Sequence, residues 1–327
     1  MSIHRMRLTA VAVVLSSAAA FAQGYPNKPI TLVVPFAAGG PTDVTARIIA
    51  EPMGKALGQN VLVENVVGAA GQTASTRVAQ ATPDGYTLIM GHMGTHAASV
   101  GLNPALKYDP ATSFQPIGLA NASPIVVVAR RDFPANNLKE FIDYVQKQPD
   151  KVTQAHAGVG SVSHTTCLLL NAQARLGRIN AAAYRGTGPA LNDLLGGQVD
   201  FMCDQLTNLA QQINAGAIKA YAVASAARAP SIPNVPTSAE AGLPGYRIES
   251  WNAVFAPKGI PADVLAKLVD ALNKALEDET TKKRFAELGS ILPTAEERKP
   301  DGLLSIVKRD VEMLTPTLKE SGVTISY

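Results

Sequence analysis

Ser161, Ser163 and His164 are the residues at which chemistry would first be suspected in this sequence. They belong to the stretch AGVGSVSHTT (residues 157–166), where a strand-like run crosses two glycines and enters a predicted helix. A serine next to a histidine suggests nucleophilic catalysis, but a catalytic triad is defined by spatial geometry and not by adjacency. The nucleophile-elbow pattern G-x-S-x-G is also absent. Anion binding is the alternative function for this stretch.

Three further loops have the same design, in which a strand ends, small residues follow and a helix begins with a hydroxyl side chain. Glycine lets a ligand approach the backbone closely, and the first turn of a helix presents unpaired N–H groups at the positive end of the helix dipole. Such a loop can bind an anion without a basic side chain. Turns and N-caps use the same residues, but four such loops in one chain favour a binding site. The loops are residues 36–43, 91–96, 158–166 and 184–189.

These loops do not fit the usual phosphate or metal sites. None has the lysine of a P-loop, and GVGSVS lacks the third glycine of a dinucleotide fingerprint. His92 and His96 have an i, i+4 spacing, but Gly94 lies between them in a predicted loop, and no Asp, Glu or Cys with metal-ligand spacing accompanies them. We therefore expect no metal and no cofactor. His156 lies in a strand pattern and is interpreted as a core histidine.

Two acidic residues near the loops have two interpretations each. Asp43 stands at a predicted helix start, where a carboxylate accepts from backbone N–H groups and suits the helix dipole. We favour that role over direct ligand contact. Asp204 follows the predicted strand VDFMC, and it either orients a loop or contacts a ligand. Arg47 is one turn inside its helix and is interpreted as structural.

Apolar strand-like runs alternate with amphipathic helical patterns through most of the chain, which predicts an α/β fold. The runs are apolar almost throughout, as in largely parallel sheets that helices cover on both faces. From about residue 263 two long amphipathic helices follow each other with no strand between them. This tail is expected to pack on a domain formed earlier in the chain.

Residues 1–22 have the features of a secretory signal peptide: Arg5 and Arg7, an apolar run, and the cleavage pattern Ala20-Phe21-Ala22. We expect cleavage after Ala22 and a periplasmic location. Loss of two of the 29 basic residues leaves 27 against 26 acidic ones, a net charge of +1. That balance gives no electrostatic footprint for nucleic acid or an anionic membrane. The length of 327 residues suggests about two domains.

Cys167 and Cys203 are the two cysteines of the chain. Their apolar surroundings, TTCLLL and DFMCDQ, favour buried free thiols. One bridge between them stays open from the sequence.

Several motifs, in order, resemble the Bug receptors, the solute-receptor family of tripartite tricarboxylate transporters. The similarity covers about residues 25–322, and no single motif carries it. The motifs are YPNKPITLVVPFAAGGPTDV at residue 25, ATPDGYTLIMGHMGTHA at 81, GVGSVSH at 158, YRGTGPALNDLLGGQVDFMCDQ at 184 and VPTSAEAGLPGYRIESWNAVFAPKGIP at 235.

The resemblance implies a type II periplasmic-binding-protein fold, with two α/β domains, a hinge and a ligand cleft between the domains. Domain 1 would comprise residues 24–124 plus 247–327, and domain 2 residues 125–246. The protein would be a monomeric receptor that closes on a small organic carboxylate. Its partner would be a two-component membrane carrier of the tripartite tricarboxylate type.

The family's ligand contacts are backbone amides, hydroxyls and water molecules. Carried over to matching positions, they imply these ligand-binding residues: Phe36, Ala38, Gly40, Thr42 and Asp43 in the first loop, Thr95 and His96 in the second, Ser161, Ser163 and His164 in the third, and Asp204.

The sequence departs from the family pattern near the expected pocket, at Thr165, Thr166, Cys167, Cys203 and Gln205. Extra room there would admit an aromatic dicarboxylate such as terephthalate, which is a hypothesis about the ligand. Two other functions stay open. One is a sensing receptor of the same fold for a signalling partner, and the other is a secreted hydrolase that uses Ser161 or Ser163 with His164.

Overall fold

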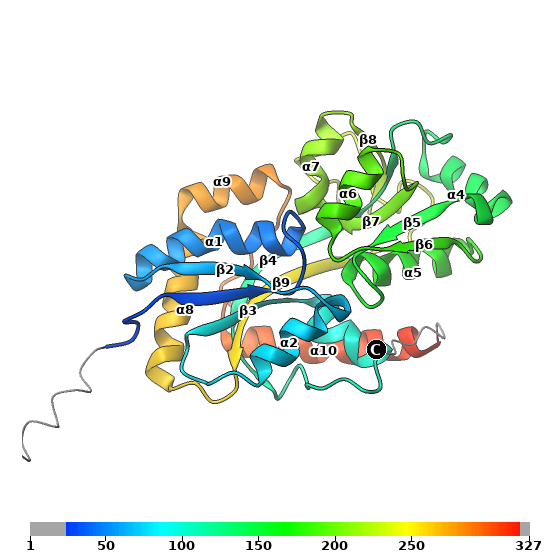
Figure 1. Cartoon of the computed structure of the whole chain (residues 1–327). Helices are drawn as coiled ribbons and strands as arrows, with labels where there is room; N and C mark the ends of the chain where they lie inside the picture. Colours follow the sequence, from blue (N-terminus) through cyan, green and yellow to red (C-terminus); the bar gives the residue numbers. More distant parts are fainter. Residues whose placement is uncertain (1–23, 321–327) are drawn as a thin grey trace, which may run out of the picture.

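Strand β4 (Phe114–Arg130) is 17 residues long and pairs with different partners along its length. Residues 114–124 pair with β9 (Glu249–Pro257), whereas residues 125–130 pair with β7 (Phe201–Gln205) and β8 (Ile218–Val223). Proline cannot donate to a ladder, and the register shifts just after Pro116. Because its two ends pair with different strands, β4 links two halves of one mixed sheet, which Figure 1 shows side by side.

The computed structural model describes residues 24–320 of the chain. The predicted signal peptide lies outside these residues. The first half contains β1 (Ile30–Val34), α1 (Pro41–Leu57), β2 (Val61–Asn65), α2 (Gln72–Ala79), β3 (Thr87–His92), a π-helical turn (Gly94–Ala98) and α3 (Ser99–Leu102). The second half contains α4 (Leu138–Lys147), β5 (Thr153–His156), α5 (Val162–Ala174), β6 (Asn180–Ala183), α6 (Thr187–Leu195), β7, α7 (Leu206–Asn214) and β8. After β9 come α8 (Ala262–Glu277), α9 (Glu279–Glu287) and α10 (Pro300–Glu320).

The sheet order is β2-β1-β3-β9-β4-β7-β5-β6, with β8 also paired to β4. Pairs around β1 and β5 are parallel, as the alternation of strands and helices predicted. The prediction of largely parallel sheets is wrong for β4 and β9, whose pairs are all antiparallel. The reason is that β9 brings the chain back from the second half and runs against β4.

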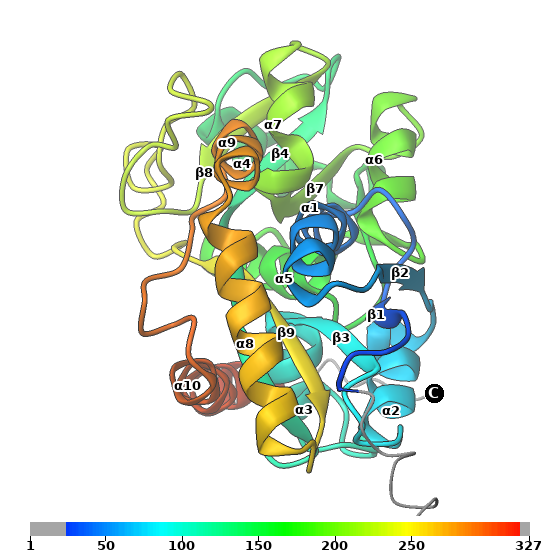
Figure 2. The same cartoon turned by 90° about the vertical axis from the view of Figure 1, so that its left-hand side faces the viewer.

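The C-terminal helices pack on the first half, which confirms the expectation for the tail. In α8, Leu268, Leu272 and Leu276 are buried in one apolar cluster with β1 and α1. On the other face of the sheet, α10 packs against α3 and β4. A Cβ on Gly101 would lie 3.0 Å from Thr315 Cα, so glycine permits this close approach. Figure 2 shows α8 running beside β9, with α10 seen end-on at the lower left.

None of the helices in residues 24–320 is long and apolar enough to cross a membrane.

Candidate functional site

The loops after β1 and β6 meet backbone to backbone between the two halves. The Ala37 N–H donates to the Arg185 carbonyl oxygen at 2.9 Å. A Cβ on Gly188 would lie 2.5 Å from the Ala38 carbonyl oxygen, so this approach requires glycine at position 188. Two of the four loops found in the sequence are therefore in direct contact.

Asp43 organises the first loop. Its Oδ2 accepts from the Gly39 N–H and from Arg47 Nε, both at 3.0 Å, and its Oδ1 accepts from Asn65 Nδ2 at 2.9 Å. Burial raises the pKa of this carboxyl, but the hydrogen bonds from Arg47, Gly39 and Asn65 outweigh burial, and the net effect lowers the pKa. The carboxylate thus stays ionised and holds the loop ahead of α1. Arg47 donates to this carboxylate, which agrees with the structural role predicted for Arg47.

The third loop positions two hydroxyls at the start of α5. Ser161 is the N-cap and accepts from the His164 N–H at 3.3 Å, while Ser163 Oγ accepts from the Ala157 N–H at 3.0 Å. The two hydroxyl oxygens lie 3.2 Å apart. Gly158 and Gly160 have φ of +101° and +93°, the left-handed region that favours glycine.

Within the described residues, no hydrogen bond joins the His164 ring to either serine. Its Nδ1 accepts from the Gly160 N–H at 3.3 Å, and its ring lies 4.7 Å from the ring of His156. Burial lowers the pKa of His164 to about 4. A nucleophilic serine needs a base within hydrogen-bond reach, and the hydroxyl bonds of Ser161 and Ser163 go to backbone N–H groups and to each other.

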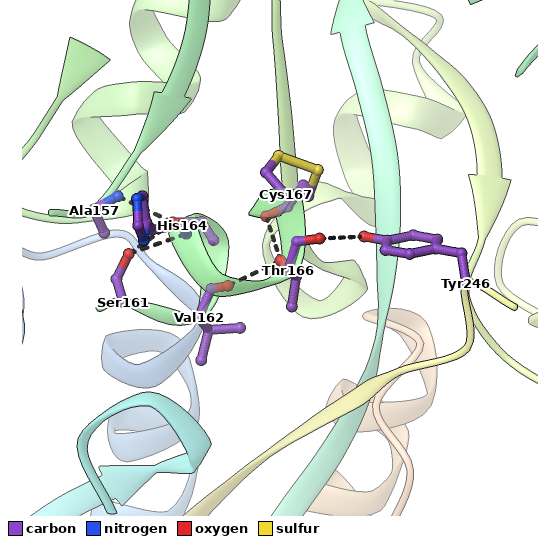
Figure 3. The surroundings of a disulfide bond; sticks show 9 residues. Ala157, Ser161, Val162, His164, Thr166, Cys167 and Tyr246 are labelled. Carbon is purple, nitrogen blue, oxygen red and sulfur yellow. Dashed lines mark hydrogen bonds between the residues drawn. A yellow bond between two sulfur atoms is a disulfide. The ribbon is translucent and has the colours of Figure 1, made fainter. Parts of the chain in front are cut away.

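A disulfide joins Cys167 of α5 to Cys203 of β7, with the Cα atoms 5.4 Å apart. The expectation of free thiols is wrong because α5 packs directly on β7, which brings two distant apolar segments together. Thr166 Oγ1 donates to the Cys203 carbonyl oxygen at 3.3 Å, and Tyr246 Oη donates to the Thr166 carbonyl oxygen at 3.2 Å (Figure 3). The bridge connects the helix that carries both serines to the strand that ends at Asp204.

Asp204 lies at the end of β7 with 1% of its surface exposed. Its Oδ2 accepts from Asn208 Nδ2 at 2.8 Å. Burial raises the pKa of this carboxyl to about 6. The pKa of Asp204 is therefore raised, whereas the pKa of Asp43 is lowered.

The second loop contributes a different residue from those that the resemblance implied. The His92 ring stacks on Phe36 with centroids 4.9 Å apart, and His92 lines the cavity. Thr95 and His96 lie behind it, where Thr95 Oγ1 is 2.9 Å from His96 Nδ1 and the His96 ring stacks on Phe255. Neither lines the cavity.

A small buried cavity of about 20 Å³ lies where these elements meet. That volume holds about one water molecule. The predicted residues Ala38 and His164 do not line it, and Ala38 faces an outer groove instead. Sequence reasoning did not single out Thr187, although it had found the fourth loop, which contains this residue. The lining residues are Phe36, Gly40, Pro41, Thr42, Asp43, His92, Ala157, Ser161, Val162, Ser163, Thr187, Asp204 and Gln205.

The first turns of three helices converge on this cavity: α1 from the first half, and α5 and α6 from the second. Helix N-termini carry partial positive charge and unpaired N–H groups. No lysine or arginine lines the cavity. Within residues 24–320, no three His, Cys, Asp or Glu side chains gather where they could hold a metal ion. The arrangement suits an anion held by backbone N–H groups and hydroxyls.

A sequence model of the TctC family, described as the tripartite tricarboxylate transporter family receptor, matches residues 45–296. The chain belongs to this family. The resemblance to the Bug receptors is thereby confirmed, and the protein is a periplasmic solute-binding receptor of the TctC/Bug type.

Solved structures of TctC/Bug receptors are similar over nearly the whole chain. The periplasmic binding protein BugD is 44% identical with a TM-score of 0.89, covering 92% of this chain and 99% of its own. MatC from Rhodopseudomonas palustris, solved with bound malate, is 44% identical with a TM-score of 0.87, covering 90% and 100%. R. palustris Rpa4515, solved with adipate, is 30% identical with a TM-score of 0.86, covering 92% and 99%. The expected type II periplasmic-binding-protein fold is confirmed.

Proposed function

We propose that this receptor captures a small aliphatic dicarboxylate in the cavity between its two halves. The observation that carries the proposal is the meeting of three helix N-termini, from both halves, at one buried cavity. One carboxylate would lie at the start of α5 against Ser161 and Ser163. The other would lie toward α1 and Thr42. Charge-assisted bonds from N–H and O–H donors would hold both.

Relatives support an aliphatic ligand over an aromatic one. MatC was solved with malate and Rpa4515 with adipate. Extra room for terephthalate was expected at Thr165, Thr166, Cys167, Cys203 and Gln205, and of these only Gln205 lines the cavity. Two are joined in the disulfide, and the Thr166 hydroxyl is bonded to the Val162 and Cys203 carbonyl oxygens. Terephthalate is therefore the weaker candidate.

Capture by domain closure follows from the burial of the site. Ser161, Ser163 and Asp204 are each at most 2% exposed, so a ligand can reach them only when the halves separate. We propose that residues 24–124 plus 247–327 move relative to residues 125–246, with β4 crossing from one part to the other and the chain returning just before β9. The closed monomer, exported by its signal peptide, would deliver the ligand to a two-component membrane carrier of the tripartite tricarboxylate type.

Replacing both serines tests the assignment. A hydrogen bond to a charged group contributes about 1.5–3 kcal/mol, so Ser161→Ala/Ser163→Ala should weaken dicarboxylate binding by at least tenfold. Calorimetric titrations with malate, adipate and terephthalate would measure this, with Ser305→Ala as the matched control. The Ser305 hydroxyl donates to a carbonyl oxygen on the exposed side of α10, far along the chain from the cavity.

Unchanged affinity in the double variant would refute the assignment of the α5 hydroxyls. Wild-type binding of terephthalate but of neither aliphatic acid would refute the choice of ligand. Turnover of an ester substrate that His164→Ala abolishes would favour the hydrolase.

A further inference from the structure

Charge in the cavity wall is unusual for a site that takes an anion. The titratable side chains that line it are Asp43, His92 and Asp204, with no lysine or arginine. Two carboxyl groups thus face the space where a dicarboxylate would bind. Asp43 and Asp204 are at most 3% exposed, and like charges repel more strongly among buried groups, where water screens them less. One of the carboxyls must be neutralised for the anion to enter.

Asp43 is already neutralised by its neighbours. Arg47 Nη2 lies 3.0 Å from Asp43 Oδ1, and both carboxylate oxygens accept from other donors. Asp204 differs, because its side chain makes no ion pair in the described part of the chain. Its side-chain hydrogen-bond partners, Asn208 at 2.8 Å and Thr187, are uncharged. Asp204 is the carboxyl that lacks compensating charge.

The elements packed around Asp204 supply no cation either. β4 pairs Val126 with it and is apolar over residues 125–129, and α7 has no charged residue over 206–214. α6 presents Thr187 from its first turn, while its Asp193 accepts from Tyr184 Oη at 2.6 Å. The nearby loop after β6 carries Arg185, whose side chain does not line the cavity.

Histidines on the remaining elements are uncharged near neutral pH. They are His156 on β5, His164 on α5 and His92 across the cleft on β3. Burial lowers the pKa of all three, to about 4 for His92 and His164. Asp43 and Arg47 on α1 compensate each other across the same cleft. Asp204 is therefore the group at the cavity that is free to change its charge between pH 6 and pH 9.

We propose that Asp204 binds the ligand as a neutral acid, so that the receptor takes up one proton with each dicarboxylate. The inference rests on the proposed function of the cavity. The proton comes from solvent, stays on Asp204 and is shared with a ligand carboxylate oxygen in an O–H···O⁻ hydrogen bond, which is short and strong. It returns to solvent when the halves open and the ligand leaves. No covalent bond forms or breaks apart from this protonation.

The pKa of Asp204 in this closed arrangement without ligand supports the assignment. Burial raises it to about 6, and a bound anion would raise it further. Between the free and bound pKa values, binding takes up about one proton, and affinity should fall by about tenfold for each pH unit.

The test is the pH dependence of malate binding between pH 6.5 and 8.5, where malate stays fully ionised. Calorimetry of the wild type in buffers of different ionisation enthalpy counts the protons directly, and the expected result at pH 7.5 is uptake of close to one. Asp204→Asn replaces the acid O–H donor by an amide N–H donor that does not titrate. Its affinity should be independent of pH and should exceed that of the wild type at pH 8.5.

Asp143→Asn on the exposed side of α4 is the control and should keep the wild-type pH profile. A wild type that binds malate with a flat profile and no proton uptake would overturn the inference and leave the proposed function intact. The same holds if Asp204→Asn loses affinity at every pH, because Asp204 would then act as an ionised acceptor. A wild type that binds no dicarboxylate at any pH would refute the proposed function and this inference with it.

Discussion

Removal of the Cys167–Cys203 disulfide should lower stability by an amount set mainly by the length of the loop that it closes. The two cysteines are separated by 36 positions. The chain-entropy relation gives about 4 kcal/mol for a loop of this length. In a chain of this size, 1 kcal/mol shifts Tm by about 2 °C or slightly less. The Tm of Cys167→Ala/Cys203→Ala should therefore fall by roughly 6–8 °C.

The double variant also loses two buried sulfur atoms, and the stability lost with their packing must be separated from the stability lost with the covalent bond. Cys167 and Cys203 are both at most 2% exposed. Wild-type protein that is unfolded and refolded in reductant keeps both sulfurs but lacks the bridge. Thermal unfolding of oxidised wild type, reduced wild type and the double variant therefore divides the total change in Tm into two parts. One part comes from the covalent bond and the other from the packing of the sulfur atoms.

Ligand affinity provides the second readout, because the bridge joins the helix that starts at Ser161 to the strand that ends at Asp204. We expect reduced wild type to bind dicarboxylate more weakly than oxidised wild type at a temperature well below both transitions. The reasoning would be refuted if reduced and oxidised wild type unfolded within 1 °C of each other.

Other substitutions test the loops around the cavity. Gly188→Ala should favour the open state and weaken ligand binding at least tenfold, because its Cβ would lie 2.5 Å from the Ala38 carbonyl oxygen. Gly196→Ala at the C-terminal end of the same helix, α6, has its nearest contact at 3.4 Å and should bind normally. Equal affinities of the two variants, measured by calorimetry, would contradict the role of Gly188. Asp43→Asn should lower Tm at pH 7, because the folded state lowers the pKa of Asp43. Such a carboxylate stabilises the fold above its unfolded pKa near 3.8, and that stability is lost as pH falls through the lower folded pKa. The Tm difference between wild type and Asp43→Asn should therefore shrink below about pH 3.8, and a constant difference in thermal scans from pH 7 to pH 2.5 would contradict the assignment.

Local sequence signals were sufficient for the α/β class and for the loops that form the site. The glycines, hydroxyls and prolines at helix starts have their effect within a few residues, and α1, α5 and α6 begin within the predicted loops 36–43, 158–166 and 184–189. The order of the motifs also predicted the family and its two-domain fold. The helix starts depend on local backbone preferences, and at Ser161 on N-capping, which short stretches of sequence carry.

Contacts between distant segments were decided only by the tertiary structure. The apolar context of Cys167 and Cys203 indicated burial, but their pairing required α5 to pack on β7. His92 and His96 both belong to the second loop. His92 ends β3 and lines the cavity, whereas the π-helical turn that follows places His96 against Phe255. Asp43 and Asp204 are both carboxylates beside a loop, and their opposite pKa shifts come from Arg47 and Asn65 near one and from burial without a cation near the other. Electrostatic environment depends on every element packed around a group, and that information lies in the fold and not in the neighbouring residues.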